Sequence, residues 1–186
     1  MQVKNILIDV MRMVGRPDAA EECEGDGQLS GETERMQRAL LLCLNAVTDE
    51  LARGYFPLKD VQSLSSQSGE YSYSSFEHTP YRIVRVTSDG KKVRWSAEPL
   101  SLVCDSKSVE VEYEYVPDAL GLSDEFSYPD SSVGVALVSY GVAAEYMLIA
   151  GEVESAEMWE SKYRSEIDRQ LSLSPVRGRV PPRRWL

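Results

Sequence analysis

The chain has 186 residues, about the length of one domain, and its 42% hydrophobic and 27% charged residues are ordinary globular values. Twenty Lys and Arg against 30 Asp and Glu give a formal net charge of −10, which argues against non-specific binding to nucleic acid or anionic lipid. No apolar run approaches the roughly 18 residues of a membrane span, and the first residues lack the layout of a signal peptide. We therefore expect an acidic, soluble protein that is made in a cytoplasm and has no membrane partner.

The N-terminal region predicts a helix followed by an acidic loop. Apolar residues recur at helical spacing over residues 3–14, and Gly15 followed by Pro17 predicts the end of that helix. Residues 18–34 contain seven acids and no base. We expect this stretch to be a loop, and we assign it no role.

A second helix is predicted over residues 36–51, where apolar side chains recur at steps of three and four. Ser30 is its predicted N-terminal cap, and Arg53–Gly54 is its predicted end. Cys43 lies within the apolar stripe, so we expect a buried thiol in the core. The three cysteines lie far apart and share no motif, which does not predict a disulfide framework: Cys23, Cys43 and Cys104.

Residues 58–117 change from a helical to an alternating pattern and predict four to six short β-strands. Residues 81–95 predict a hairpin, because Asp89–Gly90 suits the positive φ angles of a tight turn. In residues 109–115, apolar side chains alternate with Glu110, Glu112 and Glu114. This alternation predicts an antiparallel strand with one dry face and one wet, acidic face.

Two further helices are predicted at residues 131–150 and 152–171. The first is apolar nearly all round, which is typical of a helix buried centrally or between subunits. Gly134 and Gly141 lie inside this predicted helix, where close approach of another backbone would explain them. The second has apolar positions at steps of three and four: Val153, Ala156, Trp159, Tyr163, Ile167 and Leu171.

These elements predict the α+β class: an antiparallel bundle of about four helices, with an inserted small antiparallel β domain and an extended C-terminal arm. Residues 1–56 would hold the N-terminal helices, and residues 57–117 the β insertion. Residues 118–174 would hold the C-terminal helical pair, and residues 175–186 the arm. Helices from opposite ends of the chain must bury their stripes on each other, because neither pair forms a core alone.

Catalytic motifs are largely missing from the sequence. The single histidine, His78, cannot build a His-rich metal site, and neither a nucleophile elbow nor a phosphate-binding loop is present. Asp124–Glu125 is the most suggestive carboxylate pair, although solvated loop acids are the favoured interpretation. Glu145 lies on the apolar helix and is expected to be buried, facing an arginine or a subunit boundary. We therefore predict no enzyme, no cofactor and no metal.

The C-terminal arm, residues 175–186, has three prolines and no acidic side chain, so a helix is excluded. One interpretation is a frayed terminus. The other, which we favour, is an arm that docks onto another chain, because solvated segments are poor in aromatic residues. Its candidate docking residues are Arg177, Arg179, Arg183, Arg184, Trp185 and Leu186.

The C-terminal helical region resembles that of the head–tail adaptor proteins, also called connector or neck proteins, which are virion components of tailed bacteriophages. The resemblance rests on several short motifs at both ends of the chain and in the β insertion. They are residues 139–151, followed by Ala156, Trp159 and Lys162–Tyr163; residues 111–125; and Arg16–Pro17 with the second helix running into residues 50–58.

This resemblance implies a homo-oligomeric ring, typically of twelve copies, seated beneath the portal and joined to a downstream tail or neck protein. The ring would leave a channel through which the genome passes during ejection, without specific binding. The resemblance also implies that the arm reaches onto the portal protein. The residues expected to pack in the core or between subunits are Gly134, Gly141, Glu145, Tyr146, Trp159 and Tyr163.

Two other functions stay open at this point. The first is a virion-associated peptidoglycan hydrolase that uses a carboxylate pair. The second is a tail-terminator or capsid-decorating protein of the same particle. The acidic body itself suits a DNA conduit, because a wall that repels phosphate lets the duplex slide.

Overall fold

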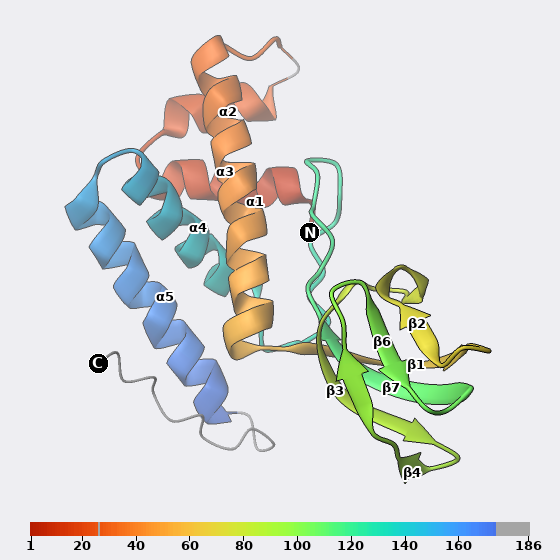
Figure 1. Ribbon diagram of the computed structural model, residues 1–186. Coiled ribbons are helices and arrows are strands. Elements are labelled where there is room, and N and C mark those ends of the chain that lie inside the picture. The colour runs from red at the N-terminus through yellow and green to blue at the C-terminus, as the bar shows by residue number, and fades with distance from the viewer. Residues whose placement is uncertain (26, 174–186) are drawn as a thin grey trace. The chain divides into compact units, whose positions relative to one another are not determined.

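The computed structural model describes residues 1–25 and 27–173 and confirms the α+β class (Figure 1). The helices are α1 Val3–Met13, α2 Pro17–Glu24, α3 Gly31–Glu50, α4 Val135–Ile149 and α5 Val153–Leu173. The strands are β1 Leu58–Ser65, β2 Glu70–Ser72, β3 Pro80–Ser88, β4 Lys91–Lys92, β5 Trp95–Ala97, β6 Ser101–Cys104 and β7 Ser108–Tyr115. The described residues divide into a helical unit, formed by those within 1–47 and by residues 120–173, and a β unit, residues 48–119.

The core of the helical unit comes from both ends of the chain. Helix α1 packs on α2 and α4, and α4 packs along α5. Asn45 on α3 holds the chain at Leu120: its side-chain oxygen accepts from the Leu120 N–H at 2.7 Å, and its amide donates to the Leu120 carbonyl at 3.1 Å. Residues distant in sequence therefore bury one set of apolar stripes.

The predicted acidic loop, residues 18–34, is wrong over residues 18–24, which lie in helix α2, and over residues 31–34, which begin helix α3. Pro17 occupies the first turn of α2, where a missing N–H costs nothing. Ala19, Ala20 and Cys23 form its buried face, and most of its acids point to solvent. These three small residues are too few to give a clear helical period, so the run of acids led to the prediction of a loop.

Helix α3 begins as predicted and ends earlier. The Ser30 hydroxyl accepts a hydrogen bond from the Thr33 N–H at 3.2 Å, which confirms Ser30 as the cap. The α-helix stops at Glu50 and is followed by a π-helical turn, Leu51–Tyr55, that contains the predicted end at Arg53–Gly54. Leu51 lies fully buried in that turn.

Helix α4 is shorter than predicted, and this changes the role of one glycine. Gly134 is the residue before the helix, with φ −84° and ψ 163°, so the prediction that it lies inside is wrong. Gly141 does lie inside and is buried. The expected close backbone is also wrong: a β-carbon at Gly141 would meet the side chains of Val47 and Tyr163.

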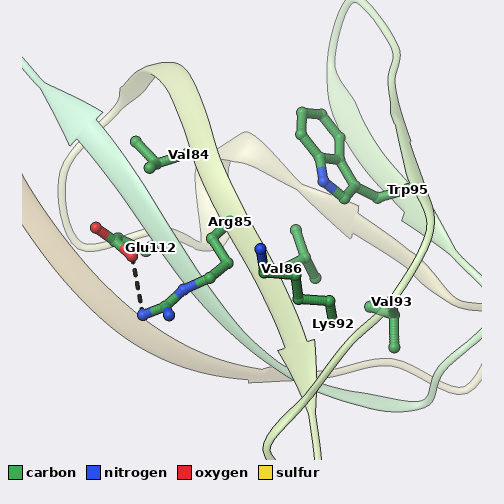
Figure 2. Close-up of a pocket in the computed structure, with 7 residues that line it drawn as sticks. All are labelled: Val84, Arg85, Val86, Lys92, Val93, Trp95 and Glu112. Atoms are coloured by element: carbon green, nitrogen blue, oxygen red, sulfur yellow. Dashed lines mark ion pairs between the residues drawn. The ribbon is translucent and has the colours of Figure 1, made fainter.

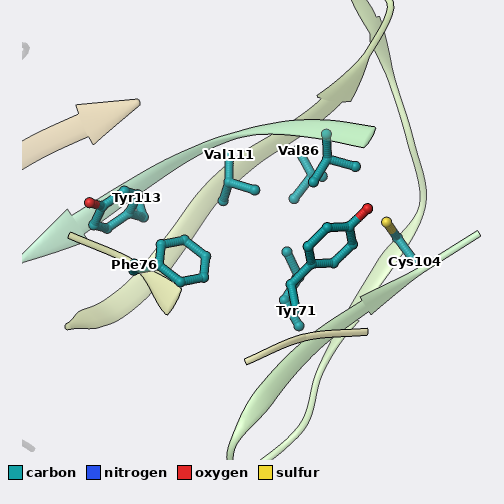
Figure 3. Close-up of a cluster of buried hydrophobic side chains, with 8 residues drawn as sticks. Tyr71, Phe76, Val86, Cys104, Val111 and Tyr113 are labelled. Carbon is teal, nitrogen blue, oxygen red and sulfur yellow. The ribbon is translucent and has the colours of Figure 1, made fainter. Parts of the chain in front are cut away.

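The β unit contains seven strands in two antiparallel sheets, where four to six strands were expected. Their orders are β1-β7-β3-β4 and β2-β6-β5. Apolar side chains of both sheets meet in one core (Figure 3). The buried members of this core are Tyr71, Phe76, Val86, Leu102, Cys104, Val109, Val111 and Tyr113.

The predicted hairpin turn is confirmed, and its second strand is shorter than expected. Asp89 and Gly90 have φ angles of 50° and 73°, the left-handed values that a tight turn between twisted strands requires. Strand β4 covers only Lys91–Lys92, paired with the end of β3. Trp95, expected in the same hairpin strand, instead begins β5 of the other sheet and pairs with Cys104.

Candidate interaction surfaces

Two hollows in the β unit share Trp95 in their lining, and Figure 2 shows the residues that line the larger one. The larger, of about 530 Å³, lies against the second half of β3, and the smaller, of about 300 Å³, against its first half. The larger is lined by Val84, Arg85, Val86, Lys92, Val93, Trp95 and Glu112. The smaller is lined by Tyr73, Pro80, Tyr81, Arg82, Ile83, Trp95 and Ala97.

Three cationic side chains, Arg82, Arg85 and Lys92, line these hollows in a protein of net charge −10. The Arg85 guanidinium lies 3.0 Å from the Glu112 carboxylate on the neighbouring strand (Figure 2). Lys91, Lys92 and Arg94 are exposed, and no ion pair joins any of them to a residue within 1–25 or 27–173. This edge of the β unit is therefore locally positive.

Glu114 contradicts the predicted wet face of β7, because it is only 2% exposed. Its cross-strand neighbours are Lys59 on β1 and Arg82 on β3. The Lys59 Nζ lies 3.7 Å from Glu114 Oε1, and the Arg82 Nε lies 3.2 Å from Oε2. The Tyr81 hydroxyl lies 3.2 Å from the same Oε2. Two cations and a hydroxyl thus satisfy a carboxylate that the alternating pattern had placed in water.

The corner between α4 and α5 exposes a small apolar cluster in the helical unit. Leu148 is 57% exposed, Ile149 is 66% exposed and Val153 is 54% exposed. Burial of Val153, expected from the helical pattern, is therefore wrong within this single chain. Three exposed large apolar side chains within six residues make the corner a candidate contact surface.

The predicted packing residues of α4 and α5 divide into core and surface positions. Tyr163 is buried against Gly141. Trp159 is also buried, with its ring centroid 5.9 Å from that of Tyr140 and the Lys162 Nζ 4.1 Å from the indole centroid. Tyr146 is half-buried. These contacts place Tyr163 and Trp159 in the core of one subunit.

Glu145 is exposed in the single chain, so its expected burial within one subunit is wrong, while a position at a subunit boundary stays a prediction. The apolar residues around it in sequence turn inward along α4 and leave this position on the outer face. The charge still acts on the core: burial, and secondarily the negative charge of Glu145, raise the pKa of the Cys43 thiol to about 11. Cys43 is 3% exposed, which confirms the predicted core thiol.

The residues considered for catalysis are occupied by structural contacts. His78 stacks on Tyr115, with ring centroids 4.1 Å apart and an angle of 9° between the planes. The Asp124 carboxylate accepts from the Gly121 N–H at 2.7 Å, while its carbonyl accepts from the Val3 N–H at 2.9 Å. Glu125 forms a β-bridge with Gln2. The backbone of Asp124 and Glu125 therefore holds this loop against the start of α1, while the Asp124 carboxylate closes the loop on Gly121.

Within the described part of the chain, no three His, Cys, Asp or Glu side chains come together as a metal site would require. Every helix among residues 1–25 and 27–173 is too short or too polar to cross a lipid bilayer. All six candidate docking residues of the arm, from Arg177 to Leu186, lie outside the described residues.

Sequence reasoning missed the Trp95 hollows, although a signal was present. Residues 82–94 contain five cations and a single acid, Asp89, in a chain of net charge −10. That local reversal of charge marks the hairpin as unusual. Trp95 lies beside the edge of this hairpin because β5 pairs with β6, and no local sequence pattern specifies that pairing.

No protein-family model matches this chain, and no curated protein matches its sequence.

Proposed function

We propose that the protein is a structural virion component, a head–tail adaptor that assembles as a ring between the portal and the tail of a bacteriophage. One of the motifs that resemble this family, residues 139–151, includes Leu148 and Ile149 of the exposed α4–α5 corner. The proposal includes an antiparallel bundle of about four helices as the body and the β unit as an insertion. We propose no catalytic activity for the protein.

The exposed corner is the observation that carries this proposal. Leu148, Ile149 and Val153 place large apolar side chains in water at one turn, where a monomer gains nothing from them. A neighbouring copy or the portal would bury them. At roughly 25 cal/mol per Å² of apolar surface, covering three such side chains favours association by a few kcal/mol per contact.

The charge of the chain also supports a place around the genome. The net charge of −10 makes a wall that repels DNA phosphates, so the duplex can move without adhering. Residues 175–186 would supply the opposite charge and a terminal aromatic residue for the portal. Their arginines would pair with portal carboxylates.

The test is assembly on the portal protein of the same phage, followed by native mass spectrometry and electron microscopy. We expect a ring-sized complex with the full-length chain, and loss of that complex with Ile149→Glu. Leu42→Glu is the matched control, since Leu42 on α3 is also exposed, at 71%, but lies outside the corner. Absence of the protein from purified virions, or assembly that Ile149→Glu leaves intact, would overturn the proposal.

A further inference from the structure

Two sheet edges of the β unit are open, and both border the Trp95 hollows. Strand β3 is paired with β7 on one side, whereas on its other side only Thr87 and Ser88 pair with β4. The Val93 N–H adds one bond to the Val86 carbonyl. Strand β5 ends the other sheet, with β6 as its single neighbour. Residues 80–85 and β5 thus each present an edge without a partner strand in the β unit.

The hollows run along the backbone of β3. In a strand, successive side chains point to opposite faces, so a cavity on one face is lined by alternate residues. Here the lining is consecutive, from Pro80 through Ile83 in the smaller hollow and from Val84 through Val86 in the larger. Two register shifts in the pairing of β3 with β7, at Tyr81 and Val84, interrupt the alternation there. Trp95 and Ala97 of β5 border the smaller hollow on its other side.

The charge along this edge selects what can bind there. Arg82 and Arg85 are already paired with Glu114 and Glu112 on β7. Lys91, Lys92 and Arg94 are exposed, and none has an ion pair with a described residue. An incoming segment with carboxylates would supply the missing partners, while a cationic segment would be repelled.

We propose that the open edge of β3 binds an acidic, extended segment of a partner protein by strand addition. Main-chain hydrogen bonds to residues 80–85 would extend the four-stranded sheet. Trp95, 38% exposed, would cover an apolar side chain of the incoming strand, and Lys92 and Arg94 would meet its acids. A second copy of the same edge is disfavoured because cations would face cations, and residues 175–186 are disfavoured by their four arginines. This inference does not depend on the proposed function.

A synthetic peptide with the β7 sequence, Ser108–Tyr115, is the probe, because it is acidic and forms a strand in the fold. Fluorescence anisotropy of the labelled peptide with the full-length protein would measure binding. We expect saturable binding, at least tenfold tighter than that of the same peptide with lysine for glutamate. Tighter binding by a peptide of residues 174–186 would overturn the proposal, as would no binding of the acidic peptide at millimolar concentration.

Charge reversal on the protein tests the surface. The double substitution Lys92→Glu and Arg94→Glu should lower the affinity for the acidic peptide at least tenfold and raise the affinity for the lysine peptide. Lys107→Glu is the matched control, because Lys107 is an exposed cation of the same unit outside both linings and should leave affinity unchanged. Trp95→Ala should lower the affinity for both peptides. Equal effects of the control and the double reversal would contradict a specific edge site.

Strand addition is separated from mere charge attraction by the peptide backbone. A peptide with the same side chains but N-methylated at alternate residues cannot donate hydrogen bonds to β3. We expect it to bind at least tenfold more weakly, and we expect the unmethylated peptide to slow amide hydrogen exchange in residues 80–85. Unchanged affinity after methylation would overturn strand addition. A peptide-induced dimer in light scattering would identify a second copy as the occupant and would also overturn it.

Discussion

The ring of Tyr163 on α5 packs directly against Gly141 on α4, and this contact fixes the spacing of the two helices. A β-carbon added at Gly141 would lie 3.0 Å from Tyr163 Cε2 and 2.8 Å from Val47 Cγ1. Both distances are shorter than ordinary carbon contacts. The glycine therefore admits the side chains of α3 and α5 into the core.

Gly141→Ala tests this contact. Alanine favours a helix interior by about 1 kcal/mol over glycine, whereas overpacking a filled core costs about 1–3 kcal/mol. The β-branched Val47 has little freedom to move, so we expect the free energy of unfolding to fall by about 1 kcal/mol in urea titration. Gly134→Ser is the control, because nothing lies within 4 Å of a β-carbon there and serine caps a helix well. A Gly141→Ala protein that is more stable than the parent would show that Val47 and Tyr163 can move aside for the added methyl group.

Glu114→Gln tests the buried carboxylate of the β unit. The substitution keeps the shape of the side chain but weakens its bonds to Lys59, Arg82 and Tyr81. We expect the free energy of unfolding to fall by about 1–2 kcal/mol, because hydrogen bonds to charged groups are the stronger ones. Glu110→Gln, on the exposed part of the same strand, should change it by less than about 0.5 kcal/mol. Equal effects of the two substitutions would contradict a structural role for Glu114.

Stability at high pH tests the environment of Tyr113. Burial, and secondarily its hydrogen bond to Asp60, raise the pKa of Tyr113 to about 12. Because the folded protein holds this proton more tightly than the unfolded chain, the contribution to stability is full below pH 10 and is lost as pH rises toward 12. Tyr113→Phe should therefore show a smaller loss of stability between pH 10 and 12 than the parent in urea titrations. Identical slopes would contradict the assignment.

Thiol reactivity tests the core positions of the cysteines. Burial raises the pKa of Cys23 and Cys43, and all three cysteines are buried. Since the thiolate is the reactive form, we expect the native protein at pH 8 to react with a chromogenic disulfide reagent only as fast as it opens. In urea, three thiols per chain should react at once. Rapid reaction of a native cysteine would contradict the packing.

Local patterns determined much of this protein. Helical spacing predicted α1, α3 and the buried face of α5 around Tyr163, and the Ser30 cap and the Asp89–Gly90 turn were recognisable as short signals. Each of these depends on residues within a few positions of one another. The burial of Cys43 also followed from its place in a single stripe.

Tertiary structure decided what depends on neighbours from distant parts of the chain. Glu114 is buried because strand register places Lys59 and Arg82 on either side of it, and Gly141 is required because Val47 and Tyr163 converge there. Trp95 borders the open edge of β3 because β5 pairs with β6 rather than continuing the hairpin. The sequence by itself determined which side chains avoid water. Only the fold decided which of them meet, because register and helix packing join residues that no local period relates.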